Sequence, residues 1–206
     1  MNNKNIGFIF ECGPEGPDIK VFRYLINLID ATIKFIPRSL GDKKKLIANC
    51  SLVSKNLLAE GCEKVFIVWD LYPPWRDSKP CRFEDRKNIN DSLKKVLKNN
   101  QLNKIVLLCI SGELESWLIA DEKVIECYIK SRIKPHAPKE ITKFRHPDRE
   151  KDPKNILCKM FSKNHLTLYN DVIDAEKIVK YITNVSKLKG SESFKRFHFK
   201  LTGRTV

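Results

Sequence analysis

The chain has 206 residues, of which 42% are hydrophobic and 31% are charged, a balance typical of a globular protein with a real core. It carries 39 Lys and Arg against 25 Asp and Glu, and the resulting net charge of +14 favours an anionic partner, most commonly nucleic acid in the cytosol. No apolar run reaches the ~18–20 residues that span a bilayer, and no secretory signal is evident, so we expect a cytoplasmic protein.

The first 110 residues alternate between strand and helix patterns. Short apolar runs predict strands at residues 6–10, 32–36, 64–69 and 104–110. Apolar positions at helical spacing predict helices at residues 18–31, 42–58 and 84–99. This alternation predicts an α/β fold, with a mostly parallel, Rossmann-like sheet of about four strands and helices on both faces.

The rest of the chain reads as helical, with one irregular excursion. A helix is expected from about Glu113, and residues 131–155 contain four prolines. Further helices are expected at about 154–163, 171–184 and 191–200. We therefore expect an α/β core over residues 1–130, and a basic loop with C-terminal helices over 131–206 that pack on it and do not fold independently.

Charge is unevenly distributed along the chain. Residues 111–130 hold five Asp and Glu against two Lys, whereas residues 131–164 hold ten Lys and Arg against four acids. Residues 185–206 hold six Lys and Arg against one acid. The two basic blocks and the acidic segment therefore need separate explanations. The basic blocks are either a surface that binds an anionic partner or a solvated surface with no specific partner.

The seven cysteines are scattered and form no C-x-x-C pair, which disfavours a zinc module and indicates reduced thiols. Cys12 lies beside Glu11, whose charge disfavours a thiolate, so a core or supporting thiol is preferred over a nucleophile. His136 and His146 fall in the basic loop, where they either contact phosphate or are solvated. P-loop and G-x-S-x-G motifs are absent.

Acidic residues follow the three most apolar strands. Glu11 follows residues 6–10, Asp70 follows 64–69, and Glu113 and Glu115 come shortly after 104–110. Parallel strands bring their carboxyl ends to one sheet edge, where ligands bind in α/β folds. Carboxylates that converge there repel one another unless a cation such as Mg²⁺ or Mn²⁺ neutralises them. The alternative is that each acid only caps a helix or faces solvent.

These elements resemble the Toprim arrangement of topoisomerases, primases and OLD-type nucleases. The resemblance is carried by Phe-Ile-Phe-Glu11-Cys-Gly13 and by Val-Trp-Asp70-Leu-Tyr72. The chain also looks like a family of small bacterial Toprim-like proteins. Three segments carry that likeness: Glu113-Leu-Glu115-Ser-Trp117-Leu-Ile-Ala-Asp121, Asp152-Pro-Lys154 and Ser193-Phe194-Lys-Arg-Phe197.

The resemblance implies a Mg²⁺-dependent nuclease, in phage defence beside a separate ABC/OLD-type ATPase subunit. Glu11 would be the general acid/base or a metal-linked carboxylate, and Asp70 a metal ligand. Glu113 and Glu115 would complete the metal site, although side chains two residues apart on a helix face different ways, which favours Glu115. Trp117 would pack in the core, and Asp121 would be either a cap or a ligand.

One position departs from the Toprim pattern, because Tyr72 replaces the second Asp of Asp-x-Asp. Either Asp77 takes its place or the metal site is weakened or inactive. Nucleic-acid contacts are expected from five residues of the basic blocks: Lys143, Arg145, Arg149, Lys195 and Arg196. The alternatives are a catalytically silent subunit that binds nucleic acid or an ATPase, and a protein partner with an incidental basic surface.

Overall fold

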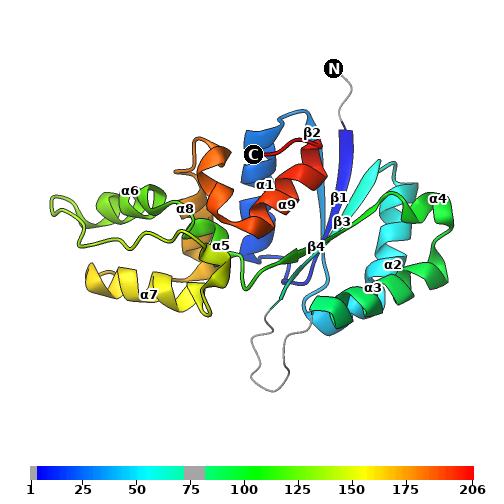
Figure 1. Cartoon of the computed structure of the whole chain (residues 1–206), viewed down its shortest axis with the longest axis horizontal. Helices are drawn as coiled ribbons and strands as arrows, with labels where there is room; N and C mark the ends of the chain where they lie inside the picture. The colour runs from blue at the N-terminus through cyan, green and yellow to red at the C-terminus, as the bar shows by residue number, and fades with distance from the viewer. Residues whose placement is uncertain (1–3, 72–81) are drawn as a thin grey trace. The chain divides into compact units, whose positions relative to one another are not determined.

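The computed structural model describes residues 4–71 and 82–206, leaving aside the side chain of Arg82. The chain divides into two compact units, Met1–Ile110 and Ser111–Val206, and each is described by itself (Figure 1). The division expected after residue 130, between an α/β core and a basic loop with C-terminal helices, stays a prediction.

A four-stranded parallel sheet forms the centre of the first unit, as the alternation of strands and helices predicts. The strand order is β2-β1-β3-β4. The strands are β1 (Lys4–Phe10), β2 (Ile33–Ser39), β3 (Lys64–Asp70) and β4 (Ile105–Ile110). The helices are α1 (Pro17–Ile29), α2 (Lys43–Ala59), α3 (Arg82–Val96) and α4 (Asn99–Leu102).

Helices cover both faces of this sheet, which explains why β1 and β3 are apolar without alternation. On one face, Phe8 and Phe10 of β1 pack against Phe22 of α1, with ring centroids 6.1 and 5.1 Å apart. On the other face, Ile9 and Trp69 belong to a buried cluster with residues of α2 and α3. Figure 1 shows these two helices beside the sheet. Strands β1 and β3 therefore bury the side chains on both of their faces.

The strand order creates a reversal point between β1 and β3. From β1 the chain passes through α1 to β2 on one side, and then through α2 to β3 on the other. The crossovers leave in opposite directions, so the carboxyl ends of β1 and β3 border the crevice where α/β folds bind ligands. Glu11 and Asp70 stand at these two ends.

Two element boundaries differ from the sequence pattern. Strand β2 was expected to stop before Pro37 but continues to Ser39, because β2 is at the edge of the sheet, where a missing amide donor is tolerated. The single helix expected from Glu113 is two helices, α5 (Glu115–Leu118) and α6 (Glu122–Ile133). The break is local, since the Asp121 side chain caps α6 by accepting from the Lys123 N–H at 3.2 Å.

The second unit is helical in its described part. After α5 and α6 come α7 (Pro153–Lys163), α8 (Glu176–Val179) and α9 (Glu192–Thr202). Short 3₁₀ segments occupy Pro147–Arg149 and Val185–Gly190, and one π turn occupies Asp171–Ala175. Helix α7 begins at the Asp-Pro-Lys segment, where Asp152 accepts a hydrogen bond from the Asn155 N–H at 2.8 Å. The helix predicted over 171–184 is thus only partly regular.

Trp117 organises the core of this unit. Its ring is fully buried and packs against Phe194 and Phe197 of α9, with centroids 5.2 and 5.4 Å away. Its indole N–H donates to Ser193 Oγ at 2.8 Å. The Glu-Leu-Glu-x-Trp and Ser-Phe-x-x-Phe segments are therefore packing partners, and the prediction that Trp117 packs in the core is confirmed.

We expect Ser193→Ala to lower the free energy of unfolding by about 1–3 kcal/mol, because it leaves the buried indole N–H without its acceptor. Ser116→Ala is the matched control, since the Ser116 hydroxyl is equally buried and has no hydrogen-bond partner among the described residues. That control should be neutral or slightly stabilising in urea denaturation. Equal destabilisation by both variants would contradict this role of Ser193.

Candidate functional site

Glu11 and Asp70 meet at the reversal point of the sheet. Glu11 follows β1, and its Oε1 accepts a hydrogen bond from the Asp70 main-chain N–H at 3.0 Å. The side chain of one strand end is therefore fixed to the backbone of the neighbouring one. This contact brings together the two residues that the sequence selects for catalysis.

The second carboxylate oxygen of Glu11 has a different environment. Oε2 is buried and has no hydrogen-bond partner among the described residues. Burial raises the pKa of Glu11 from its ordinary 4.5 to about 7, although the Lys43 charge and the Asp70 N–H act in the opposite direction. Glu11 can therefore gain or lose a proton near neutral pH.

Lys43 is the residue of this site that sequence reasoning missed. Its Nζ donates to the Asp70 carbonyl oxygen at 2.7 Å and to Asp85 Oδ2 at 3.3 Å. The ammonium thus holds the end of β3 to α2 and α3. No local signal singles out Lys43, because Lys44 and Lys45 stand beside it in the first turn of the same helix.

The turn after Glu11 is tightly packed. The Cys12 carbonyl accepts from the Ser39 hydroxyl and from the Gly41 N–H, the latter at 3.1 Å, which ties the turn to the end of β2. Burial and the nearby Asp18 raise the pKa of the Cys12 thiol far above its usual range. The thiol is therefore protonated, which agrees with a supporting role and not with a nucleophile.

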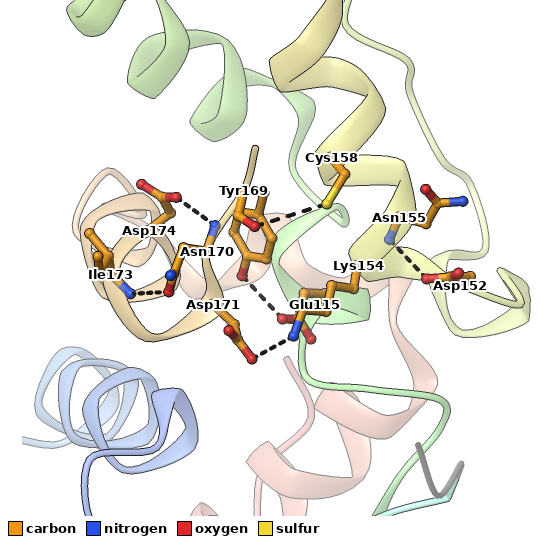
Figure 2. A network of polar contacts seen from close by, with 10 residues as sticks. All are labelled: Glu115, Asp152, Lys154, Asn155, Cys158, Tyr169, Asn170, Asp171, Ile173 and Asp174. Carbon is orange, nitrogen blue, oxygen red and sulfur yellow. Dashed lines mark hydrogen bonds and ion pairs between the residues drawn. The ribbon is translucent and has the colours of Figure 1, made fainter. Parts of the chain in front are cut away.

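Glu115 lies in a polar network of the second unit, shown in Figure 2. Its Oε1 accepts from the Tyr169 hydroxyl at 3.1 Å, and Lys154 Nζ donates to Asp171 Oδ2 at 2.7 Å. Burial alone would lower the pKa of Lys154, but Asp171, Glu115 and Glu113 together raise it. The Lys154 ammonium therefore provides positive charge to these carboxylates within the unit.

Glu113 is half-buried in the same unit, and its Oε2 is buried with no hydrogen-bond partner in the described part of the chain. Burial, with Asp152 nearby, raises the pKa of Glu113. Glu115 is thus bonded to Tyr169 and Glu113 lies near Asp152 and Lys154, all within the second unit. The role of Glu113 and Glu115 as ligands of the Glu11 and Asp70 site stays a prediction.

The remaining candidate residues have varied surroundings. Asp121 acts as the cap of α6, while Tyr72 and Asp77 lie outside the described residues. Of the five expected nucleic-acid contacts, Arg145 and Arg149 are exposed, and three have polar partners. Those three are Lys143 with Glu122 at 3.4 Å, Lys195 with Glu192 at 2.6 Å, and Arg196 with Ser111 Oγ at 3.1 Å.

The resemblance implies Mg²⁺, and Glu11 offers suitable chemistry. Among residues 4–71 and 82–206, no group of three or more His, Cys, Asp and Glu side chains is placed to hold a metal ion. Mg²⁺ commonly uses one or two carboxylates, keeps several waters and meets substrate phosphates. A buried carboxylate oxygen without a partner, next to the strand end that carries Asp70, fits such a site.

Comparison with protein-family models, curated proteins and solved structures gave no match. The Toprim-like relationship therefore stays a prediction. In the described part of the chain, every helix is too short or too polar to cross a membrane. Function must consequently be inferred from the residues themselves.

We expect Gly16→Ala to lower the free energy of unfolding by about 1–3 kcal/mol through overpacking. A Cβ at Gly16 would lie 2.6 Å from both Cβ and Sγ of Cys12, whereas a Cβ at Gly13 would meet nothing within 4 Å. Gly13→Ala in the same turn is therefore the matched control and should be near neutral in chemical denaturation. A tolerated Gly16→Ala would contradict the close packing.

The raised pKa of Glu11 makes stability depend on pH. The native state holds the Glu11 proton more tightly than the unfolded state, so this group makes the fold less stable as pH rises from about 4.5 to about 7. Glu11→Gln keeps an acceptor for the Asp70 N–H but cannot ionise. The difference in melting temperature, Glu11→Gln minus wild type, should therefore be larger at pH 8 than at pH 5. A difference that is the same at both pH values would contradict the assignment.

Proposed function

We propose that the protein is a Mg²⁺-dependent nuclease that hydrolyses phosphodiester bonds of nucleic acid, with Glu11 as its general acid/base. The observation that supports this most is the half-buried Glu11 carboxyl group at the reversal point of the sheet, with a pKa of about 7. One of its oxygens has no hydrogen-bond partner among the described residues. General acid/base catalysis is most effective when the pKa of the group lies near the working pH.

The residues around Glu11 have distinct roles in this proposal. Oε1 is fixed by the Asp70 N–H, which orients Oε2 to accept the proton of an attacking water. Asp70 would hold Mg²⁺ with water and substrate phosphate, and the bound ion would neutralise charge on the phosphoryl oxygens. Lys43 is a positioning residue, since it holds the main chain at Asp70.

The charge of the chain supports a polyanionic substrate. The net charge of +14 attracts the phosphate backbone, and the basic residues are concentrated in 131–164 and 185–206. Carboxylates at the strand ends of a basic protein are the pattern expected where Lys and Arg hold a phosphate backbone and acids act on it. The resemblance adds phage defence and an ATPase partner to this proposal.

The direct test incubates the pure chain with single- and double-stranded DNA and RNA, in Mg²⁺ or Mn²⁺ and in EDTA. We expect metal-dependent cleavage, which Glu11→Gln and Asp70→Asn should each reduce by about 10²–10⁴-fold. Glu60→Gln is the control, because Glu60 is an exposed carboxylate paired with Arg38 at 2.7 Å and caps α2 at the end opposite Lys43. Cleavage that persists in both site variants would disprove the proposal.

A second candidate is a catalytically silent subunit that binds nucleic acid or an ATPase with the same fold. It is favoured by Tyr72 in place of a second Asp, and by the lack of a three-ligand acidic cluster among the residues described. Steeply salt-dependent binding to DNA or RNA without turnover, and unchanged by Mg²⁺, would select it.

A further inference from the structure

A hollow of about 550 Å³ lies in the second unit, and its lining shares no residue with the Glu115 network of Figure 2. The end of α6 and the segment after it form one wall, and the end of α7 with the next residues forms the other. Basic and imidazole side chains dominate the lining: Arg132, Lys134, His136, Lys139 and His165. The described lining residues include no carboxylate, which makes the hollow suited to an anion.

Two contacts connect the walls of the hollow. Asn164 is buried, and its Oδ1 accepts from the Lys139 main-chain N–H at 2.6 Å. Lys139 Nζ lies 3.0 Å from His165 Nε2. A charged ammonium can only donate, so we assign Nε2 as the acceptor, which leaves the Nδ1 proton of His165 available for a ligand.

His165 has an unusual backbone for its residue type. It terminates α7 with a φ of +57°, while its N–H bonds to the Ser162 carbonyl and the Leu166 N–H to the Phe161 carbonyl, both at 3.0 Å. This is a Schellman cap, whose left-handed position is usually glycine because a side chain there is strained. Strain of this kind is characteristic of functional positions.

The C-terminal ends of α6 and α7 and the nearby Asp174 reduce the positive charge of the hollow but do not remove it. Each helix C-terminus carries about half a negative charge. Asp174 lies 3.5 Å from the Arg132 guanidinium, which also donates to the Tyr128 hydroxyl at 2.8 Å. After these are subtracted, the Lys134 and Lys139 ammonium groups still leave a positive excess, and both imidazoles can add hydrogen bonds.

We propose that this hollow binds a phosphate group, carried either by a free nucleotide or by the 5′ end of a nucleic-acid strand. The cationic side chains and the His165 Nδ1–H provide donors for phosphate oxygens. Ile133, Ala137 and Leu166 line the same hollow and offer apolar surface for the attached sugar or base. The site is independent of Glu11, so it extends the proposed function without depending on cleavage.

The test measures affinity by calorimetry at fixed salt and in EDTA, which prevents metal-dependent cleavage. The probes are AMP against adenosine, and a 5′-phosphorylated oligonucleotide against the same strand with a 5′-hydroxyl. We expect at least one phosphorylated probe to bind about tenfold more tightly than its unphosphorylated counterpart. Preference confined to AMP identifies a free nucleotide, and preference confined to the oligonucleotide identifies a strand end.

Two variants test the residues. Lys134→Ala/Lys139→Ala should abolish the preference for the phosphorylated probe. Lys123→Ala/Lys177→Ala removes the same charge from exposed positions of the same unit and should retain the preference. His165→Gly should raise the melting temperature, because it relieves the strain of the left-handed backbone. The same variant should bind the phosphorylated probe more weakly. A more stable variant that binds less cannot be explained by misfolding.

Three results would overturn the proposal. One is equal affinity of the wild type for phosphorylated and unphosphorylated probes. Another is equal loss in both lysine double variants, which would indicate unspecific charge attraction. The last is full retention of the phosphate preference in Lys134→Ala/Lys139→Ala and in His165→Gly.

Discussion

The hydrogen bond between Glu11 Oε1 and the Asp70 N–H is the contact on which the first unit's candidate site depends. It joins the ends of β1 and β3, the two strands between which the chain reverses direction. Because one carboxylate oxygen is committed to this bond, the other has a defined position and its burial controls its protonation. Lys43 holds the same strand end by donating to the Asp70 carbonyl oxygen.

Much of the fold could be predicted because its signals are local. Apolar runs and helical spacing are patterns within short stretches of sequence, and they were sufficient to predict the parallel sheet and its helices. Pro37 misled the pattern, since whether a proline ends a strand depends on whether the strand is at an edge. The break between α5 and α6 depends on the cap at Asp121, which apolar spacing alone does not reveal.

The candidate site was less predictable, because protonation and pairing depend on residues far apart in the sequence. Position after a strand was enough to select Glu11 and Asp70. It was not enough to show that Lys43 and Asp85 join them, or that Lys154, Tyr169 and Asp171 surround Glu115. The left-handed backbone of His165 belongs to the cap of α7, and the sequence pattern does not reveal it because this position is usually glycine.

The open edge of the sheet has a consequence for self-association. Strand β2 ends the sheet, and an edge strand with free backbone groups can recruit a strand from another copy of the same chain. Pro37 removes one amide donor from this strand, and the exposed Lys34 places positive charge on it, whereas Arg38 is paired with Glu60. Two such edges would repel each other while lacking one of the bonds needed to pair. Pairing between copies through β2 is therefore disfavoured, which protects this edge of the sheet from strand addition.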